Sequence, residues 1–256
     1  MLDLRRHVNV LQAMIIRDLM GRFGRQNLGF VWTVLEPMIL CTGVMVVWSF
    51  IHAGTMKGVP IVAFVLTGYM PLTLWRHLTN PMSRILHNNV SLLYHRPVSH
   101  AHILAARLLL EFFSTSAALL VIYFVVTATG MIEPAEDPGL VLAAWLLGGW
   151  YFAAMGLVIG AWTEYWEPAE KFLMPAQYLQ LPVSGIFYMV DWMPHYAQQL
   201  LMLNPTISFV EMFRAGMFGE AVTTYYDPDY LAACSAAMTI AGVVVTYRVR
   251  DHIETN

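Results

Sequence analysis

Three histidines lie close together in the sequence and are candidates for metal chemistry. His100 and His102 form an HxH pair, and His95 lies shortly before them. Imidazole binds zinc and related metals, but such sites usually add thiolates or carboxylates, and neither lies nearby in the sequence. We therefore expect a solvated histidine loop with no metal. Cys41 and Cys234 lie in apolar runs that predict neither a disulfide nor a metal site.

Residue patterns typical of catalysis are absent from the sequence. It contains no HExxH, no GxSxG and no catalytic Cys/His spacing. Neither Lys57 nor Lys171 follows a glycine, so the Walker A phosphate loop is missing as well. We expect a chain that is not itself an enzyme and that binds no cofactor. If ATP drives its work, ATP and Mg must be bound by a partner subunit.

The composition points to a membrane protein. Hydrophobic residues make up 58% of the 256 residues and charged residues only 12%, about half the share of about 25% that is usual in soluble domains. So few charges cannot cover a soluble surface. The formal net charge of -3 shows no basic excess, so nucleic acid is not an indicated partner.

Long stretches without charge predict the elements that hold any site. A helix needs roughly 20 mainly apolar residues to cross a bilayer. A further uncharged window, 192–210, contains prolines and amides and is not expected to span. We predict an all-α membrane protein with six transmembrane helices in a single domain, 1–256. The six windows are 37–56, 58–75, 112–132, 138–163, 172–190 and 230–247.

The arrangement of basic residues predicts the orientation of these spans. With the N-terminus in the cytoplasm, every lysine and arginine except Lys57 and Arg214 falls on the cytoplasmic side. Six spans then place both termini in the cytoplasm. The arginines before the first span, without a continuous apolar stretch, argue against a secretory signal peptide.

Residues 1–27 have the periodicity of an amphipathic helix. Leu4, Val8, Leu11, Ile15 and Leu19 share one face at a period of 3.6 residues. Such a helix packs on the rest of the protein or lies in the inner-leaflet interface, where its arginines meet anionic headgroups. We favour the interfacial helix.

Two connections are longer than neighbouring helices require. The cytoplasmic segment 76–107 predicts a short helix over about 81–94, followed by a turn at Arg96-Pro97. On the outer side, Asn204-Pro205 has the pattern of an N-cap followed by proline at the first helical position. The amphipathic run after it predicts, over 192–218, two short helices that dip into the outer leaflet.

Glycines and prolines recur at helical spacings. Gly156 and Gly160 form a GxxxG pair, which allows close helix packing either within one chain or across a dimer. Pro168, Pro175 and Pro182 are spaced by two helical turns, so they share one face of the fifth predicted span. They predict a kink there, and a hinge in a moving gate is the functional alternative.

Glu36 is the acidic residue placed deepest in a predicted span, roughly 10 Å from its start at 1.5 Å per residue. An intramembrane carboxylate is costly and faces a partner or water. A proton relay would need further ionisable groups at similar depth, so we favour anchoring or gating for Glu36. Glu111 is shallower and should pair locally with Arg107, four residues before it.

Three stretches resemble the permease subunits of ABC-2 type polysaccharide exporters. Residues 17–39, RDLMGRFGRQNLGFVWTVLEPMI, are similar to the start of the first span in that family. The likeness continues through 91–111 and 204–216, and the six-span order covers nearly the whole chain. The matching elements, which most resemble the capsular-polysaccharide branch, are Arg22-Phe23-Gly24, Leu28-Gly29, Trp32 and Glu36-Pro37.

This resemblance implies a function and a set of partners. The chain would be a homodimeric permease joined to two copies of a separate ABC ATP-binding subunit. It would lie in the inner membrane and move a lipid-linked anionic capsular polysaccharide from cytosol to periplasm. Periplasmic and outer-membrane capsule export proteins would continue the route. Residues near 81–94 would include the coupling helix, 1–27 would be the interfacial helix in contact with membrane lipid, and 192–218 would be extracellular re-entrant helices.

Two groups of candidate site residues follow. Arginines at the cytoplasmic end of the first span suit a phosphate or an acidic sugar, although inner-leaflet lipid would also explain them, and aromatic faces suit sugar rings. The substrate or gate candidates are Arg22, Arg25, Trp32, Glu36, Pro37, Trp150 and Tyr151. The candidates for coupling to the ATPase are Ser83, Arg84, His87, Asn88, Tyr94 and Arg96.

Other functions stay open at this point. Within the superfamily, the exported molecule could be an O-antigen, a teichoic acid or a drug. An intramembrane enzyme, such as an acyltransferase or protease, lacks a nucleophile with its base. An ion-coupled or proton-coupled transporter would depend on Glu36 alone.

Overall fold

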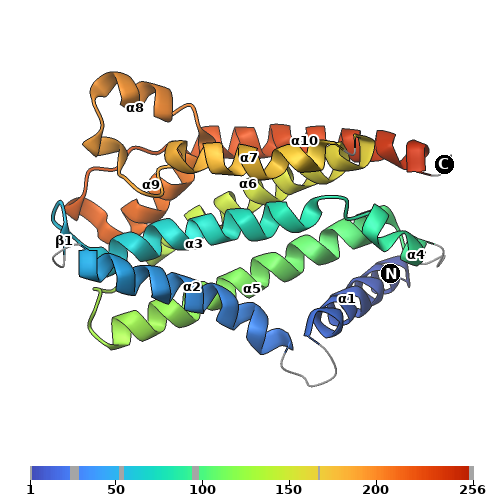
Figure 1. Ribbon diagram of the computed structural model, residues 1–256, viewed down its shortest axis with the longest axis horizontal. Coiled ribbons are helices and arrows are strands. Elements are labelled where there is room, and N and C mark those ends of the chain that lie inside the picture. Colours follow the sequence, from blue (N-terminus) through green and yellow to red (C-terminus); the bar gives the residue numbers. More distant parts are fainter. Residues whose placement is uncertain (1, 24–28, 52–54, 94–97, 167, 254–256) are drawn as a thin grey trace.

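The structure is a computed structural model that describes residues 2–23, 29–51, 55–93, 98–166 and 168–253. Most of the long helices in the described part of the chain run roughly along the long axis of the molecule, and α1 lies obliquely at one end (Figure 1). Their bounds are α1 (Leu2–Phe23), α2 (Gly29–Ile51), α3 (Ile61–Thr79), α5 (His100–Ala128), α6 (Pro138–Tyr165), α7 (Ala169–Gln180) and α10 (Pro228–Ile253).

Short elements occupy the two ends of this bundle. At one end lie the antiparallel pair β1 (Thr55–Met56) and β2 (Val59–Pro60), with Thr55 opposite Pro60, together with α8 (His195–Leu201) and α9 (Pro205–Phe218). At the other end lie α4 (Val90–Leu93) and both described ends of the chain (Figure 1). Five short 3-10 helices complete the described part: η1 (Asn80–Met82), η2 (His87–Asn89), η3 (Leu181–Val183), η4 (Val190–Trp192) and η5 (Gly219–Ala221).

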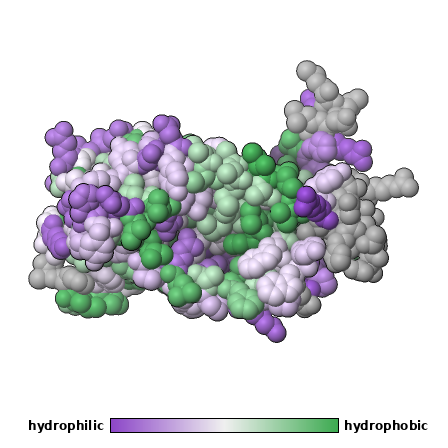
Figure 2. All heavy atoms as spheres, turned by 90° about the horizontal axis from the view of Figure 1, so that it is seen from above, coloured by the Kyte–Doolittle hydropathy of each residue, from purple (hydrophilic) through white to green (hydrophobic). Residues whose placement is uncertain are grey.

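The surface divides along the same axis. In the face that Figure 2 presents, hydrophobic residues gather in the middle and hydrophilic residues lie at both ends. Four described helices are long and apolar enough to cross a membrane: Val34–Ile51, His100–Ala128, Pro138–Tyr165 and Pro228–Arg248. They agree with the first, third, fourth and sixth predicted spans.

Helix α3 corresponds to the second predicted span and forms the centre of the fold. It is buried along nearly its whole length and packs against α2, α5, α6 and α9. A helix that is apolar on all sides is typical of a buried core position. Proline inside α3, at Pro71, is accommodated in this packed setting.

The fifth predicted span, 172–190, is wrong as one continuous helix. Helix α7 ends at Gln180 and passes into η3, which contains Pro182. Proline cannot donate an amide hydrogen bond, and Gly185 adopts a positive φ of 75°, a conformation that glycine adopts without strain. The apolar residues up to Val190 therefore form turns, and side chains from α9 bind their backbone.

The Gly156 and Gly160 pair packs within the chain. A Cβ added at Gly156 would lie 2.3 Å from the carbonyl oxygen of Leu78. At Gly160 it would lie 3.1 Å from the carbonyl oxygen of Met82. The two glycines therefore allow α6 to approach the end of α3 and η1 closely, which is the intrachain alternative of the two that the spacing allows.

Helix α1 packs on the N-terminal part of α5. Met14 is buried in a cluster with Ile85, Leu86, Ile103 and Leu104. The buried stripe is shifted from the predicted face: Leu11 and Ile15 belong to it, whereas Val8 is 42% exposed. Leu4 has no described side-chain environment. The described part of this helix, Leu2–Phe23, packs on the rest of the chain, and its position in the inner-leaflet interface stays a prediction.

Candidate functional site

The predicted helix over 81–94 is broken into short pieces. The chain passes from η1 through a turn to η2 and α4, and Arg84 has a left-handed φ of 49°. Two side chains at the end of α6 accept hydrogen bonds from backbone amides of this segment. The Arg84 amide donates to Thr163 Oγ1 (3.0 Å), and one Glu164 carboxylate oxygen accepts from the amides of Leu86 (2.8 Å) and His87 (3.0 Å). We call residues 83–89, held in this way, the anchored loop.

The anchored loop carries four of the six coupling candidates. Ser83 and Arg84 are half-buried, whereas His87 and Asn88 are exposed. The other two candidates, Tyr94 and Arg96, lie outside the described residues. The loop therefore presents His87 and Asn88 outward while its backbone is fixed to α6.

Polar side chains join the anchored loop to α1 and α5. Arg17 donates to Asn89 Oδ1 (2.9 Å) and forms an ion pair with Asp18 (2.6 Å). Arg107 lies 3.9 Å from Asp18 and 3.2 Å from the buried carboxylate of Glu111. The predicted local pair of Arg107 with Glu111 is confirmed, and the network extends it to the N-terminal helix.

The expected solvated loop is wrong for the HxH pair, because both histidines belong to helix α5 and His102 is buried. The Ser99 amide donates to His102 Nδ1 (3.1 Å), and His7 Nδ1 lies 2.9 Å from His102 Nε2, with the two rings stacked. Both ring nitrogens of His102 are thus engaged inside the protein. The part of the chain that the structure describes holds no group of three or more potential metal ligands. His95 lies outside it.

The substrate and gate candidates separate into groups. Trp32 and Glu36 are exposed on α2, and Pro37 beside them is buried. On α6, the exposed Trp150 donates from its indole nitrogen to Thr239 of α10 (3.0 Å), whereas Tyr151 is buried. Figure 1 places α2 and α10 on opposite sides of α3, so one subunit does not bring these groups together. The Arg22 backbone belongs to α1, its side chain is not described, and Arg25 lies outside the described residues.

A buried arginine on α9 makes several hydrogen bonds to the turns after α7. Arg214 is fully buried, and its guanidinium donates to three carbonyl oxygens in the turns after α7. The acceptors are Gly185 (2.7 Å), Tyr188 (2.6 Å) and Ile186 (2.9 Å). Glu211, one helical turn earlier, lies 3.7 Å from the same guanidinium. We call Glu211 and Arg214 together the outer clasp.

Glu211 extends the outer clasp to two further segments. Its carboxylate accepts from the amides of Val190 (3.2 Å) and Tyr225 (3.1 Å), and Arg214 stacks 4.7 Å over the ring of Phe64 in α3. Burial raises the pKa of Glu211, and the neighbouring Arg214 opposes that shift. Burial lowers the pKa of Arg214 to about 10, which leaves the guanidinium charged at neutral pH.

Sequence reasoning missed the outer clasp. It placed Arg214 among the residues of the outer side and did not foresee that α9 is buried in the protein from Thr206 to Met217. The re-entrant position of 192–218 stays a prediction. The expected N-cap is confirmed, because Asn204 Oδ1 accepts from the Thr206 amide (3.1 Å) and Pro205 opens the helix. The available signal was the i,i+3 spacing of Glu211 and Arg214, which favours a local ion pair.

These features belong to a known class of membrane proteins. Residues 9–218 match the ABC-2 type transporter family, which covers most of the chain. The chain belongs to that family, and with its four candidate spanning helices it is a multi-pass membrane protein.

Relatives of known name place the chain within the family. It is 35% identical to the capsule polysaccharide export inner-membrane protein CtrC of Neisseria meningitidis serogroup A, over 96% of this chain and 92% of the relative. It is 33% identical to the capsule polysaccharide export inner-membrane protein BexB of Haemophilus influenzae, over the same shares. The polysialic acid transport protein KpsM of Escherichia coli is 23% identical over 94% of this chain and 93% of the relative. The resemblance to the capsular branch of ABC-2 permeases is confirmed.

Proposed function

We propose that this chain is the permease subunit of an ABC transporter that exports lipid-linked capsular polysaccharide from the cytosol to the periplasm. A separate subunit binds ATP and Mg and supplies the energy. The similarity over nearly the whole length to named capsule export proteins carries this proposal. O-antigen, teichoic acid and drug export are the alternatives that the experiment below has to separate.

The proposed topology has six passes, with both termini in the cytoplasm of a cell with an inner membrane. Helix α3 has 19 residues and so reaches about 28 Å at 1.5 Å per residue, close to the thickness of the hydrocarbon core of about 30 Å. Helix α7 with η3 forms the remaining, interrupted pass. Both described chain ends lie at the same end of the bundle, which supports an even number of passes.

The transporter is proposed to be a homodimer. Helix α2 exposes Trp32, Ile39, Val47 and Phe50, together with the carboxylate-bearing Glu36, on its free side. A carboxylate inside a membrane faces protein or water in preference to lipid. A second copy facing α2 would provide that surface and would enclose a path between the two chains for the polymer.

The anchored loop is proposed as the docking site for the ATP-binding subunit. Its exposed residues His87 and Asn88 lie at the end of the bundle that holds both described chain ends. Because Glu164 fixes the loop backbone to α6, a force on the loop is passed to a spanning helix. Capsule export proteins of the periplasm and outer membrane would receive the polymer afterwards.

Removing the Glu164 carboxylate should uncouple the two subunits. Glu164→Ala leaves the amides of Leu86 and His87 without their acceptor, at a local cost of about 1–3 kcal/mol. We expect normal membrane insertion. A loss of about 1 kcal/mol lowers the equilibrium population of the ordered loop relative to the disordered loop about fivefold, so polymer-stimulated ATPase activity should fall by at least about that factor. Glu170→Ala removes an exposed carboxylate in the first turn of α7 and is the matched control. Equal coupling in the two variants would contradict the role of Glu164.

The function itself is tested by co-purification and by deletion. The chain, expressed together with candidate ATP-binding subunits, should co-purify with one of them. Cells without the chain should accumulate capsular polymer in the cytosol and lack it at the surface. Accumulation of O-antigen or teichoic acid instead would assign a different substrate, and gradient-driven transport by the purified chain alone would refute the proposal.

A further inference from the structure

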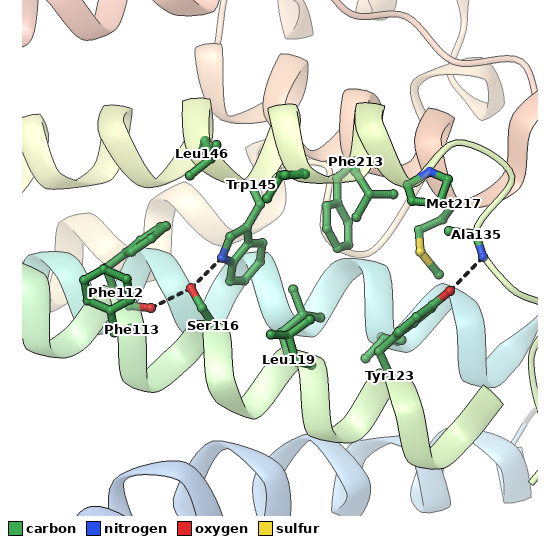
Figure 3. A pocket seen from close by; sticks show the side chains of 15 residues that line it. Phe112, Phe113, Ser116, Leu119, Tyr123, Ala135, Trp145, Leu146, Phe213 and Met217 are labelled. Carbon is green, nitrogen blue, oxygen red and sulfur yellow. Dashed lines mark hydrogen bonds between the residues drawn. The ribbon is translucent and has the colours of Figure 1, made fainter. Parts of the chain in front are cut away.

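An apolar pocket of about 450 Å³ opens between α5 and α6, away from the sites described above. Phe112, Phe113 and Tyr123 line it from α5, and Leu142 and Leu146 line it from α6. Figure 3 shows Phe112, Phe113, Tyr123 and Leu146 along the gap, together with Phe213 and Met217 of α9. The pocket is therefore a groove with a protein floor and an open side.

The chemistry of the lining fits a hydrocarbon. No charged side chain of the described residues lines the groove. Its polar groups bond to one another: Ser116 Oγ accepts from the Trp145 indole nitrogen (2.8 Å), and the Tyr123 hydroxyl accepts from the Ala135 amide (2.8 Å). A lining of this kind offers water few hydrogen-bond partners and so suits an apolar ligand.

The dimensions of the groove match one leaflet of the bilayer. The stretch from Phe112 to Tyr123 covers about 16 Å of helix, and one leaflet of hydrocarbon is about 15 Å thick. Tyr123 lies near the end of α5 and Pro138 begins α6, so the groove runs from the loop between these helices to mid-helix. Both helices are candidate membrane spans, so the open side faces hydrocarbon.

We infer that this groove binds one acyl chain of a phospholipid in the leaflet next to the α5–α6 loop. The exposed side chains that line it are all apolar, namely Phe113, Leu120, Pro138, Leu142 and Leu146. They offer no hydrogen bond or charge that would select a polar protein segment. That this leaflet is the periplasmic one follows from the topology in the proposed function. The binding of an acyl chain does not depend on that topology.

Photoreactive phospholipids test this inference on the full chain in nanodiscs of phosphatidylethanolamine and phosphatidylglycerol. A diazirine near the methyl end of the acyl chain should label the Phe112 and Phe113 end. A diazirine near the ester should label the Tyr123 and Pro138 end. Leu142 is 58% exposed, and Leu142→Trp should fill the groove and reduce labelling at least about fourfold, the effect of one lost buried methylene.

The control variant introduces the same residue, tryptophan, outside the groove. Phe124 is 74% exposed on α5 and does not line the pocket, so Phe124→Trp should leave labelling unchanged. Labelling as strong at Phe124 as in the groove, or unchanged in Leu142→Trp, would overturn the inference. An unlabelled groove with loss of the dimer in Leu142→Trp would instead assign it to a second copy. These readouts need neither transport nor ATP hydrolysis, so they test the inference independently of the proposed function.

Discussion

Replacing Arg214 with alanine should prevent the chain from folding stably and abolish export. The variant leaves three carbonyl groups and the Glu211 carboxylate buried without their cation. Removing one partner of a buried ion pair costs about 3–5 kcal/mol, a large part of a typical stability of 5–15 kcal/mol. The turns after α7 would lose the side chain that holds them against α3. Thermal unfolding of the detergent-purified chain and surface capsule measure the two effects.

Two further variants make the Arg214 prediction specific. Lys171→Ala removes an exposed cation from α7 and should leave both the unfolding temperature and the surface capsule unchanged. Arg214→Lys keeps the charge but cannot reach three carbonyls at once, so we expect intermediate stability. If Arg214→Ala unfolded at the same temperature as Lys171→Ala, the outer clasp would have no part in holding the fold.

A side chain at Gly156 should separate α6 from α3. Because the added Cβ of Gly156→Ala would lie 2.3 Å from the Leu78 carbonyl oxygen, the two backbones must move apart. Overpacking of this kind costs about 1–3 kcal/mol, and a larger residue such as valine should cost more. We expect a lower unfolding temperature and reduced export, because the displaced end of α6 carries the Thr163 and Glu164 contacts to the anchored loop.

A graded series checks this steric explanation. Gly160→Ala should have a smaller effect, since its Cβ would meet the Met82 carbonyl oxygen at 3.1 Å. At Gly43 an added Cβ meets nothing within 4 Å in the subunit, so Gly43→Ala should be close to neutral for stability of the monomer. Dissociation of the proposed dimer by Gly156→Ala, with no loss of monomer stability, would instead place Gly156 at a seam between copies.

Much of the fold follows from the distribution of charge in the sequence. Uninterrupted apolar windows located α2, α5, α6 and α10, because the absence of charge over such a length leaves few alternatives. The same criterion failed for 172–190. Hydropathy measures side chains only, and it does not register that Pro182 and a glycine with positive φ interrupt the backbone hydrogen bonds.

The sequence predicted where the anchored loop lies in the chain, but it did not predict the contacts that shape it. The length of the 76–107 connection indicated an exposed cytoplasmic-side element, but the helix expected there is divided by contacts from Thr163 and Glu164, which lie far away in the sequence. The outer clasp needed knowledge of which backbone carbonyls Arg214 reaches. Local spacing suggests the pair with Glu211 but cannot identify acceptors in another segment.

The contact between α1 and the anchored loop has a consequence for how the subunit responds to its surroundings. Met14 packs beside Ile85 and Leu86, and Arg17 is bonded to Asn89, so α1 and this loop must shift together. The outward side of α1 carries the exposed Arg5 and Arg6. If the proposed ATP-binding subunit docks on the anchored loop, changing the anionic lipid content beside α1 should alter the rate at which that subunit turns over ATP.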